Sequence, residues 1–569
     1  MTMTKEFTPI SKYFVFFWAC LWLGAIHYFQ YNSGGSGLEI PSSNMTWCFV
    51  ALLIASCCYR IIQQKELTLS KTTWFFIASV CLMSLPYLYP ENWFADELLT
   101  AESAGRGLGL VAGLLFFIAL QQVPKTSGAM FKLSYIVLFG IAIEAIFILG
   151  QFFLLTENNW LNYNIEYRPY GVFQQVNVAA SFMATGVALS LYLLLQQSRQ
   201  DSCNSYLKIT LLACSLICPL AVMLTQSRAG TLGLGVVMIL GYLGSYSSFK
   251  SQLKLRNIWL GLMISGILLG MASIQLSKTD GRSLEQVSSM GIRKAIYTRS
   301  FKMVTEHPVL GWGYGNFEWS YLNHQAKAYT EDQNIALGPD KLEHPHNELL
   351  YWAVEGGLVS VVGIFLLMAY FFWQLRKSKQ KLIFLALFAP LAIHCMLELP
   401  FYHAASPWIL FIFLIWLTDH SKEYSFAVEY TFALRALTPI LVVCTMLFML
   451  TNLHTLYLVR KFDKTKATTL FSQVINPIGL SDMLTSYNLI MRYNVAISTG
   501  NKEDLNQFLS YMRDWIKYEP RPVFYKMYAG ALLALKQEDY AKYIAAENNY
   551  LFPQKQMRIE NGQLFTEKE

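Results

Sequence analysis

Residues 344–357 read HPHNELLYWAVEGG and open an apolar run that continues to about residue 374. A helix of this length spans the ~30 Å hydrocarbon core of a bilayer. Pro345 disfavours helical backbone at His344, so the helix is predicted to begin just after it, with Asn347 as its N-cap. His346 then lies at the positive end of the helix dipole, which favours a neutral imidazole that can accept a proton. The alternative for a lone histidine is an interfacial side chain without a catalytic role.

The whole chain has the composition of a membrane protein. Its 569 residues are 54% hydrophobic and 14% charged, whereas soluble domains contain about 25% charged residues. Apolar segments of spanning length predict an all-α integral membrane protein with about thirteen transmembrane helices. The expected spans lie near residues 13–30, 45–62, 72–89, 105–122, 132–154, 178–196, 207–225, 229–247, 257–276, 348–374, 382–398, 404–418 and 436–457.

Basic residues are distributed unevenly between the loops on the two sides of these spans. With the N-terminus in the cytoplasm, lysines and arginines recur in the cytoplasmic loops, whereas the short loops of the other side hold only Arg106, Arg168 and Arg228. Cytoplasmic loops of membrane proteins carry such an excess of positive charge. The loop 277–347 and the tail 459–569 are therefore predicted to lie outside the cytoplasm.

The chain divides into a polytopic membrane domain, residues 1–458, and a water-soluble tail, residues 459–569. The polar loop at about 277–347 is too long for a passive connection, which favours a function for it. Stretches 504–517 and 523–535 of the tail have apolar residues at helical spacing, so the tail is predicted to be a small helical domain. Paired helices of the tetratricopeptide kind are one arrangement for it.

Several classes of function find no support in the sequence. The net charge of +7 comes from the loops, and no basic patch interleaved with aromatic residues indicates nucleic acid. The ten cysteines show neither a disulfide framework nor metal-ligand spacing. No glycine-rich nucleotide loop is present. We therefore expect no metal and no cofactor.

Charged residues gather beside the spans on the outer side. Arg228 lies between two expected spans, where a guanidinium is costly without a partner and marks a functional site. The alternative is an arginine that extends to the lipid headgroups. Arg293, Tyr297 and Arg299 precede the stretch HPVLGWGYGNF, residues 307–317, whose alternating glycines permit a tight turn or a close backbone approach.

Two further groups of polar residues lie on the same side. Arg168-Pro169-Tyr170-Gly171 precedes Gln174-Gln175-Val176-Asn177, and His394 precedes Glu398-Leu399-Pro400-Phe401-Tyr402 at the end of a span. Pairing of Glu398 with Arg168 is the alternative to a functional role for either residue. Arginines match phosphate oxygens, and a neutral histidine suits proton abstraction from a hydroxyl. Both together suit transfer from a lipid-linked phosphate donor to an acceptor hydroxyl.

These motifs, in this order, resemble the core of the O-antigen ligase and polymerase superfamily. The resemblance rests on Ser227-Arg228-Ala229-Gly230, Arg293 with Tyr297, residues 308–317, and His346-Asn347-Glu348-Leu349-Leu350 with Glu355 and Gly357. The motifs at 168–177 and 394–402 are similar to those of bacterial protein O-oligosaccharyltransferases, the PglL type that glycosylates pilin. The resemblance covers roughly residues 165–410. Tyr297 departs from a frequent tryptophan, and Ala229 from a common glycine.

The resemblance implies metal-independent transfer of a preassembled oligosaccharide from a polyprenyl-pyrophosphate donor, such as undecaprenyl pyrophosphate. The acceptor would be a serine or threonine of pilin or another periplasmic protein, at the periplasmic face of the bacterial inner membrane. It implies His346 as the catalytic residue and Arg228 and Arg293 as pyrophosphate-binding residues. Supporting roles fall to Asn347, Arg168, Gln175, Asn177, Arg299, His344, Glu398 and Tyr402.

Three alternatives share the same observations. The same chemistry could act on the lipid A core, as in an O-antigen ligase, or could polymerise a glycan. The motif at 398–402 and the soluble tail favour a protein acceptor instead, by resemblance. A lipid-linked glycan flippase or transporter, which is not an enzyme, predicts internal repeats and charges near the bilayer midplane. The sequence has no such repeat, and its charges gather at one face.

Overall fold

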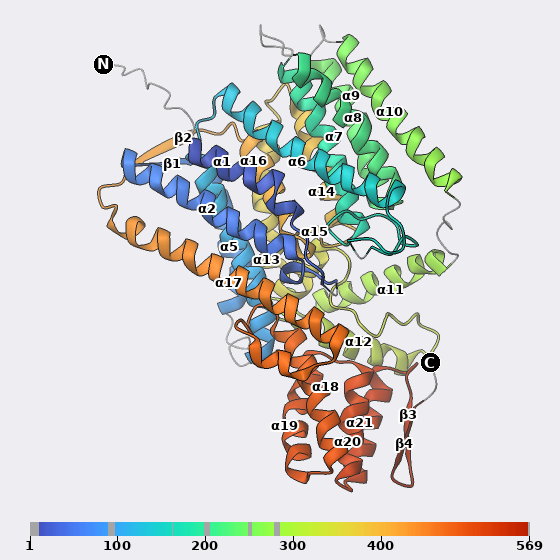
Figure 1. Ribbon diagram of the computed structural model, residues 1–569. Helices are drawn as coiled ribbons and strands as arrows, with labels where there is room; N and C mark the ends of the chain where they lie inside the picture. The colour runs from blue at the N-terminus through green and yellow to red at the C-terminus, as the bar shows by residue number, and fades with distance from the viewer. Residues whose placement is uncertain are drawn as a thin grey trace. The chain divides into compact units, whose positions relative to one another are not determined.

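The computed structural model describes residues 11–32, 34–88, 97–161, 163–197, 205–248, 253–277 and 285–566 (Figure 1). Its described part is almost entirely helical, as expected. The chain forms two compact units. The first contains residues 1–77, 110–280 and 366–480, and the second contains residues 78–109, 281–365 and 481–569.

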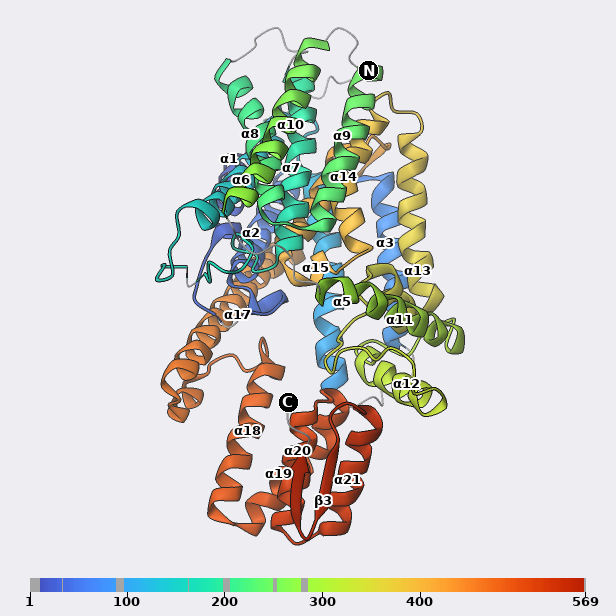
Figure 2. The same ribbon diagram turned by 90° about the vertical axis from the view of Figure 1, so that its right-hand side faces the viewer.

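The first unit is built around a buried central helix, α7 (Val176–Gln197). Around it pack α6 (Ser127–Phe153), α8 (Ser205–Leu224), α9 (Arg228–Ser248) and α14 (Lys381–Cys395), and Figure 2 shows α7 to α9 and α14 side by side. The helices α7 and α9 approach closely at Ala180 and Gly230, because both residues are small. The remaining helices of this unit are α1 (Lys12–Leu23), α2 (Pro41–Gln64), α10 (Leu253–Leu276), α15 (Pro400–His403), α16 (Ala405–Thr418) and α17 (Phe432–Thr465).

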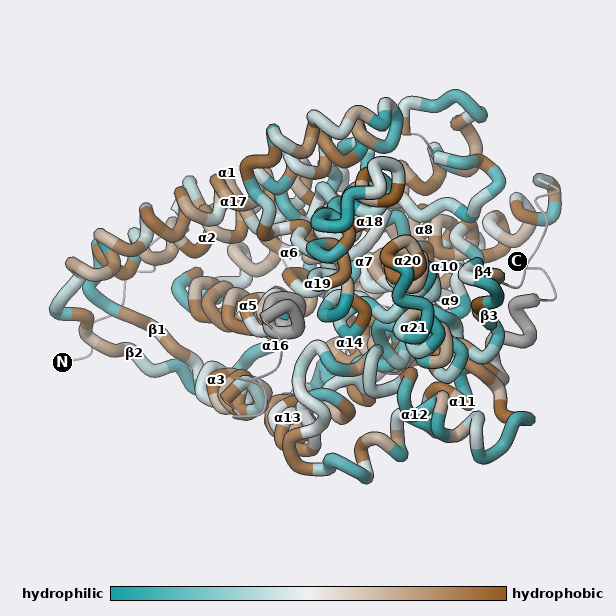
Figure 3. Tube along the Cα trace, turned by 90° about the horizontal axis from the view of Figure 1, so that it is seen from below, coloured by the Kyte–Doolittle hydropathy of each residue, from teal (hydrophilic) through white to brown (hydrophobic). Residues whose placement is uncertain are grey.

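The protein is a multi-pass membrane protein by the length and composition of its helices. Among the described residues, 9 helices are long and apolar enough to cross a membrane. They include α5 (Glu97–Gln121) and α13 (Glu348–Leu375), and apolar residues dominate such helices in Figure 3. Each expected span overlaps a helix, but α1, α3 (Lys71–Ser84), α14 and α16 are shorter than the ~20 residues that a perpendicular crossing needs.

Two short β-ladders occur in addition to the helices that the sequence predicts. In the first unit, β1 (Glu66–Ser70) pairs antiparallel with β2 (Glu423–Ala427). In the second unit, β3 (Met557–Glu560) pairs antiparallel with β4 (Gln563–Thr566). Asn561 and Gly562 join β3 to β4, and both have positive φ, of 52° and 74°. Two such residues form the tight turn that suits a hairpin.

The second unit combines the polar loop with the tail. It contains α11 (Glu285–Glu306), α12 (Phe317–Glu331), the beginning of α13, and the tail helices α18 (Ser481–Thr499), α19 (Lys502–Tyr518), α20 (Pro522–Ala534) and α21 (Glu538–Leu551). The tail helices pack consecutively as antiparallel neighbours (Figure 1). Leu322 and Ala326 of α12 lie in the same hydrophobic core as Phe508, Trp515 and Tyr525. The loop and the tail therefore fold around one core.

Candidate active site

The helix that opens after residue 347 begins where local chemistry predicts. The side-chain oxygen of Asn347 accepts a hydrogen bond from the amide of Leu350 at 2.9 Å, as an N-cap does. The helix α13 then starts at Glu348. Glu348 accepts a hydrogen bond from the indole of Trp352 at 3.0 Å, one turn later. The predicted capping role of Asn347 is confirmed.

His346, just before this cap, has an unusual backbone. Its φ is 54°, in the left-handed region that few residues other than glycine occupy. Its amide donates a hydrogen bond to Nδ1 of His344 at 3.2 Å, and the two rings meet edge to face with centroids 4.8 Å apart. This acceptor role leaves the proton of a neutral His344 on Nε2. Such backbone conformations gather at functional sites, where surrounding contacts maintain them.

The helix α11 supplies a residue that contacts His346. The hydroxyl of Tyr297 donates a hydrogen bond to the backbone carbonyl of His346 at 3.2 Å. Arg293, which is half-buried, stands four residues before Tyr297 and therefore on the same face of α11. The second unit thus brings Tyr297 to His346, and Arg293 stands one helical turn from Tyr297 on α11. The tyrosine that departs from the superfamily's frequent tryptophan contributes its hydroxyl here.

Arg299 lies on the same helix but has different surroundings. Its Nη1 donates to the hydroxyl of Tyr321 at 2.9 Å and to Oε1 of Gln325 at 3.0 Å, and the residue is only 8% exposed. Burial raises the pKa of Tyr321, although Arg299 opposes the shift. Arg299 therefore joins α11 to α12. This position fits a supporting role through the fold rather than direct contact with a donor.

The alternating glycines pack against a break in α13. Gly357 has a φ of 64° and interrupts the helix. The amide of Trp312 donates to the carbonyl of Val354 at 2.9 Å, and the amide of Leu358 donates to the carbonyl of Pro308 at 2.8 Å. A Cβ at Gly311 would lie 2.4 Å from the carbonyl oxygen of Glu355. The predicted close backbone approach is confirmed, and these contacts satisfy polar groups that the break releases.

An ion pair stands at the centre of this packing. The carboxylate of Glu355, which is fully buried, pairs with Arg106 of α5 and accepts hydrogen bonds from the amides of Gly315 and Phe317, both at 3.1 Å. The guanidinium of Arg106 also lies 4.1 Å from the ring centroid of Tyr351. From the sequence alone, Arg106 was predicted only as a charge in a short loop. Its isolated position in a small-residue helix is the signal that marks a buried, paired arginine.

Arg228 belongs to the first unit and lies at the connection between α8 and α9. It is the first residue of α9 and is exposed. The hydroxyl of Ser227 accepts a hydrogen bond from the amide of Gly230 at 3.1 Å and donates one to Oδ1 of Asn177 at 2.6 Å. Ser227 therefore caps α9 while Asn177 ties the cap to α7. Asn177, for which a supporting role is predicted, thus contacts the residue just before Arg228.

Arg168 contacts the same connection between α8 and α9. Its Nη1 donates to the carbonyl of Gln226 at 3.3 Å, and burial lowers the pKa of its guanidinium. The following turn is fixed by α6, because Oε1 of Gln151 accepts from the amides of Tyr170 and Gly171 at 2.9 and 2.8 Å. Buried Glu144, which pairs with His27 at 2.9 Å, accepts from the next amide. Gln151 and Glu144 lie inside an apolar span and were not predicted as site residues from the sequence.

The remaining predicted residues surround the starts of α7 and α15. Oε1 of Gln175 accepts from the amide of Asn177 at 2.6 Å, so Gln175 caps α7. His394 is fully buried, and its Nδ1 lies 2.8 Å from the hydroxyl of Ser181. Glu398 lies in the turn after α14 and Tyr402 lies in the short helix α15, and both are half-buried. The first unit thus gathers Arg168, Gln175, Asn177, Arg228, His394, Glu398 and Tyr402, whereas Arg293, Arg299, His344, His346 and Asn347 belong to the second.

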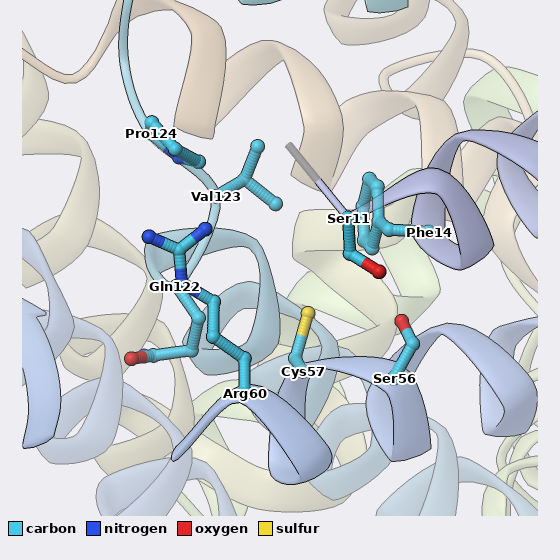
Figure 4. A pocket seen from close by; sticks show the side chains of 8 residues that line it. All are labelled: Ser11, Phe14, Ser56, Cys57, Arg60, Gln122, Val123 and Pro124. Atoms are coloured by element: carbon cyan, nitrogen blue, oxygen red, sulfur yellow. The ribbon is translucent and has the colours of Figure 1, made fainter. Parts of the chain in front are cut away.

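A small pocket lies elsewhere in the first unit. Its lining is Ser11, Phe14, Ser56, Cys57, Arg60, Gln122, Val123 and Pro124 (Figure 4). The cavity volume of about 10 Å³ holds about one water molecule. None of the predicted site residues lines it. We assign it no role in binding a glycan donor.

Comparison with known families covers most of this region. Residues 211–365 match the family described as O-Antigen ligase, and this segment contains Arg228, Arg293 and His346. Residues 169–194, with Gln175 and Asn177, match the family described as Protein glycosylation ligase. Residues 382–563 match the family described as Virulence factor membrane-bound polymerase, C-terminal. No curated protein matches the chain.

Proposed function

We propose that this chain, whose residues 211–365 match the O-antigen ligase family and whose residues 169–194 match the protein glycosylation ligase family, is an O-linked oligosaccharyltransferase. It moves a preassembled glycan from a polyprenyl-pyrophosphate donor to serine or threonine hydroxyls of pilin or other periplasmic proteins. The basic-residue asymmetry of the loops supports an active site on the periplasmic face of the bacterial inner membrane.

The observation that carries this proposal is the position of His346. The residue is held in the left-handed region beside the start of α13, between His344 and the hydroxyl of Tyr297. His346 accepts the proton of the acceptor hydroxyl as its oxygen attacks the anomeric carbon of the glycan. General base catalysis of this kind contributes ~10²–10⁴-fold to a rate.

The two arginines act on the leaving group. As the bond between the anomeric carbon and the phosphate oxygen breaks, negative charge grows on the departing polyprenyl pyrophosphate. Arg228 and Arg293 stabilise this charge, because guanidinium forks match phosphate oxygens. Electrostatic stabilisation is usually the largest single contribution to catalysis. Arg168 and Glu398 support this site, and the tail helices position the protein acceptor.

Glycan polymerisation is the second candidate, because residues 382–563 match a polymerase C-terminal family. The protein-glycosylation segment at 169–194 favours a protein acceptor.

Purified enzyme, reconstituted with a lipid-linked oligosaccharide, is offered pilin, lipid A core or no further acceptor. We expect glycan on serine or threonine of the protein. Glycosylated lipid A core identifies a ligase, longer lipid-linked chains identify a polymerase, and translocation without a new bond identifies a transporter.

A further inference from the structure

The turn between α19 and α20 carries a buried arginine that contacts the polar loop. Arg521 has a side chain that is only 11% exposed, and its Nη1 lies 2.7 Å from Oε1 of Glu318 at the start of α12. The same Nη1 donates to the carbonyl of Pro520 at 2.9 Å. Nη2 lies 3.8 Å from Glu343, and Nε lies 3.7 Å from Glu519. One tail guanidinium thus faces three carboxylates.

Hydrogen bonds and the chain itself connect two of these carboxylates, Glu318 and Glu343, to His344 and His346. Oε1 of Glu318 also accepts a hydrogen bond from the amide of Leu342 at 2.7 Å. Leu342 is 3% exposed, and Glu343 connects it to His344. His344 in turn accepts the amide of His346 at 3.2 Å. A short path of hydrogen bonds and covalent bonds therefore runs from Arg521 to His346.

The first residue of α12 connects the same end of this helix to α13. Phe317, next to Glu318, donates its amide to buried Glu355 of α13. The start of α12 therefore contacts both α13, through Phe317, and the segment 341–343, through Glu318. Burial raises the pKa of Glu318, and the adjacent guanidinium of Arg521 opposes this shift. Loss of the guanidinium would leave buried negative charge without its partner.

We propose that Arg521 is a positioning residue for glycan transfer, which holds the segment 341–346 so that His346 meets the acceptor hydroxyl. The tail thereby takes part in the chemistry through the fold, in addition to any contact with the acceptor. This proposal rests on the proposed function of His346. A displacement of about 1 Å at a reacting group can reduce a rate by about 10²-fold.

The test compares Arg521→Gln with Arg513→Gln in the full-length, reconstituted enzyme. Arg513 stands in α19, and its side chain is 67% exposed. We expect Arg521→Gln to lower kcat by about tenfold or more, while KM for the lipid-linked glycan changes by less than about twofold. Arg521→Lys keeps the charge without the fork and should be intermediate. Arg513→Gln should match the wild type.

Hydrogen exchange gives a readout that does not depend on activity. In Arg521→Gln, the amides of Leu342 and His346 should exchange faster, while those in the core of α20 keep their protection. Unchanged exchange at Leu342, or wild-type kcat in a folded Arg521→Gln enzyme, would overturn the proposal. If that variant does not fold, Arg521→Lys and Glu318→Gln take its place with the same criteria. A wild-type enzyme that glycosylates no protein would refute the proposed function, whereas the exchange result would still decide whether Arg521 holds the segment.

Discussion

The carboxylate of Glu355 and the guanidinium of Arg106 form a buried ion pair, although the two residues are 249 positions apart in the chain. The pair lies where α13 is interrupted at Gly357, and Glu355 also accepts the amides of Gly315 and Phe317. It therefore joins α5, the glycine-rich stretch and the broken helix. The beginning of α13, which presents Asn347 and His346, depends on this junction.

Breaking this pair should destabilise the protein strongly. Glu355→Gln or Arg106→Gln leaves one buried charge without its partner, which costs about 3–5 kcal/mol of unfolding free energy. Thermal unfolding in detergent measures the loss. The control is Lys542→Gln, which removes an exposed partner of Glu538 on α21 and should leave the melting temperature unchanged. Equal melting temperatures for all three variants would show that the ion pair has no structural importance.

The hydroxyl of Tyr297 is expected to matter for rate. Tyr297→Phe removes the hydrogen bond to the carbonyl of His346 and keeps the ring. A neutral hydrogen bond contributes about 0.5–1.5 kcal/mol, so kcat should fall by roughly two- to tenfold. Steady-state kinetics at equal enzyme concentration measure it. The control is Tyr540→Phe, at an exposed position of the tail. An equal fall in kcat for Tyr540→Phe would show that the hydroxyl of Tyr297 has no specific effect on the rate.

A positive charge alone should not replace either of the two arginines that we propose to bind the donor. Arg228→Lys and Arg293→Lys keep a positive charge but lose the planar fork that matches pyrophosphate. We expect each to reduce glycan transfer by about tenfold or more, since hydrogen bonds to charged groups contribute about 1.5–3 kcal/mol. Arg513→Lys serves as the exposed control. Normal glycosylation by both variants would exclude these arginines from donor binding.

The topology prediction concerns the polar loop and the tail. A single cysteine at Lys302 or Lys502, both exposed, is introduced into a variant that has no other cysteine. Both should react with a membrane-impermeant maleimide in intact spheroplasts, because the asymmetry of basic residues predicts that these segments lie outside the cytoplasm. A cysteine at Lys250 in the same background should react only after lysis. The opposite labelling pattern would reverse the proposed orientation.

Local rules predicted much of this fold. Bilayer thickness sets the length of a spanning helix, so each expected span overlaps a helix in the structure. The start of α13 followed from Pro345 and Asn347, because both effects act within a few residues. The hairpin at Asn561 and Gly562 also has a local signal, which the sequence analysis did not use.

Contacts between distant residues were not predictable in the same way. Nothing beside Arg106 in the sequence identifies Glu355 as its partner, because tertiary packing brings them together. The same holds for Leu322 and Ala326, whose apolar side chains enter a core formed mainly by the tail. The candidate site therefore follows from the sequence as a set of residues. Its supporting residues, Arg106 and Arg521 above all, emerge only from the fold.

The most direct test compares two histidines that stand two residues apart. His346→Ala and His344→Ala are purified, matched for membrane insertion and enzyme amount, and assayed for glycan attached to a purified protein acceptor. If His346 is the general base and His344 supports its backbone, His346→Ala abolishes transfer and His344→Ala retains a measurable fraction. An active His346→Ala enzyme beside an inactive His344→Ala enzyme would assign the reaction to the other imidazole, and two active variants would contradict the general-base mechanism.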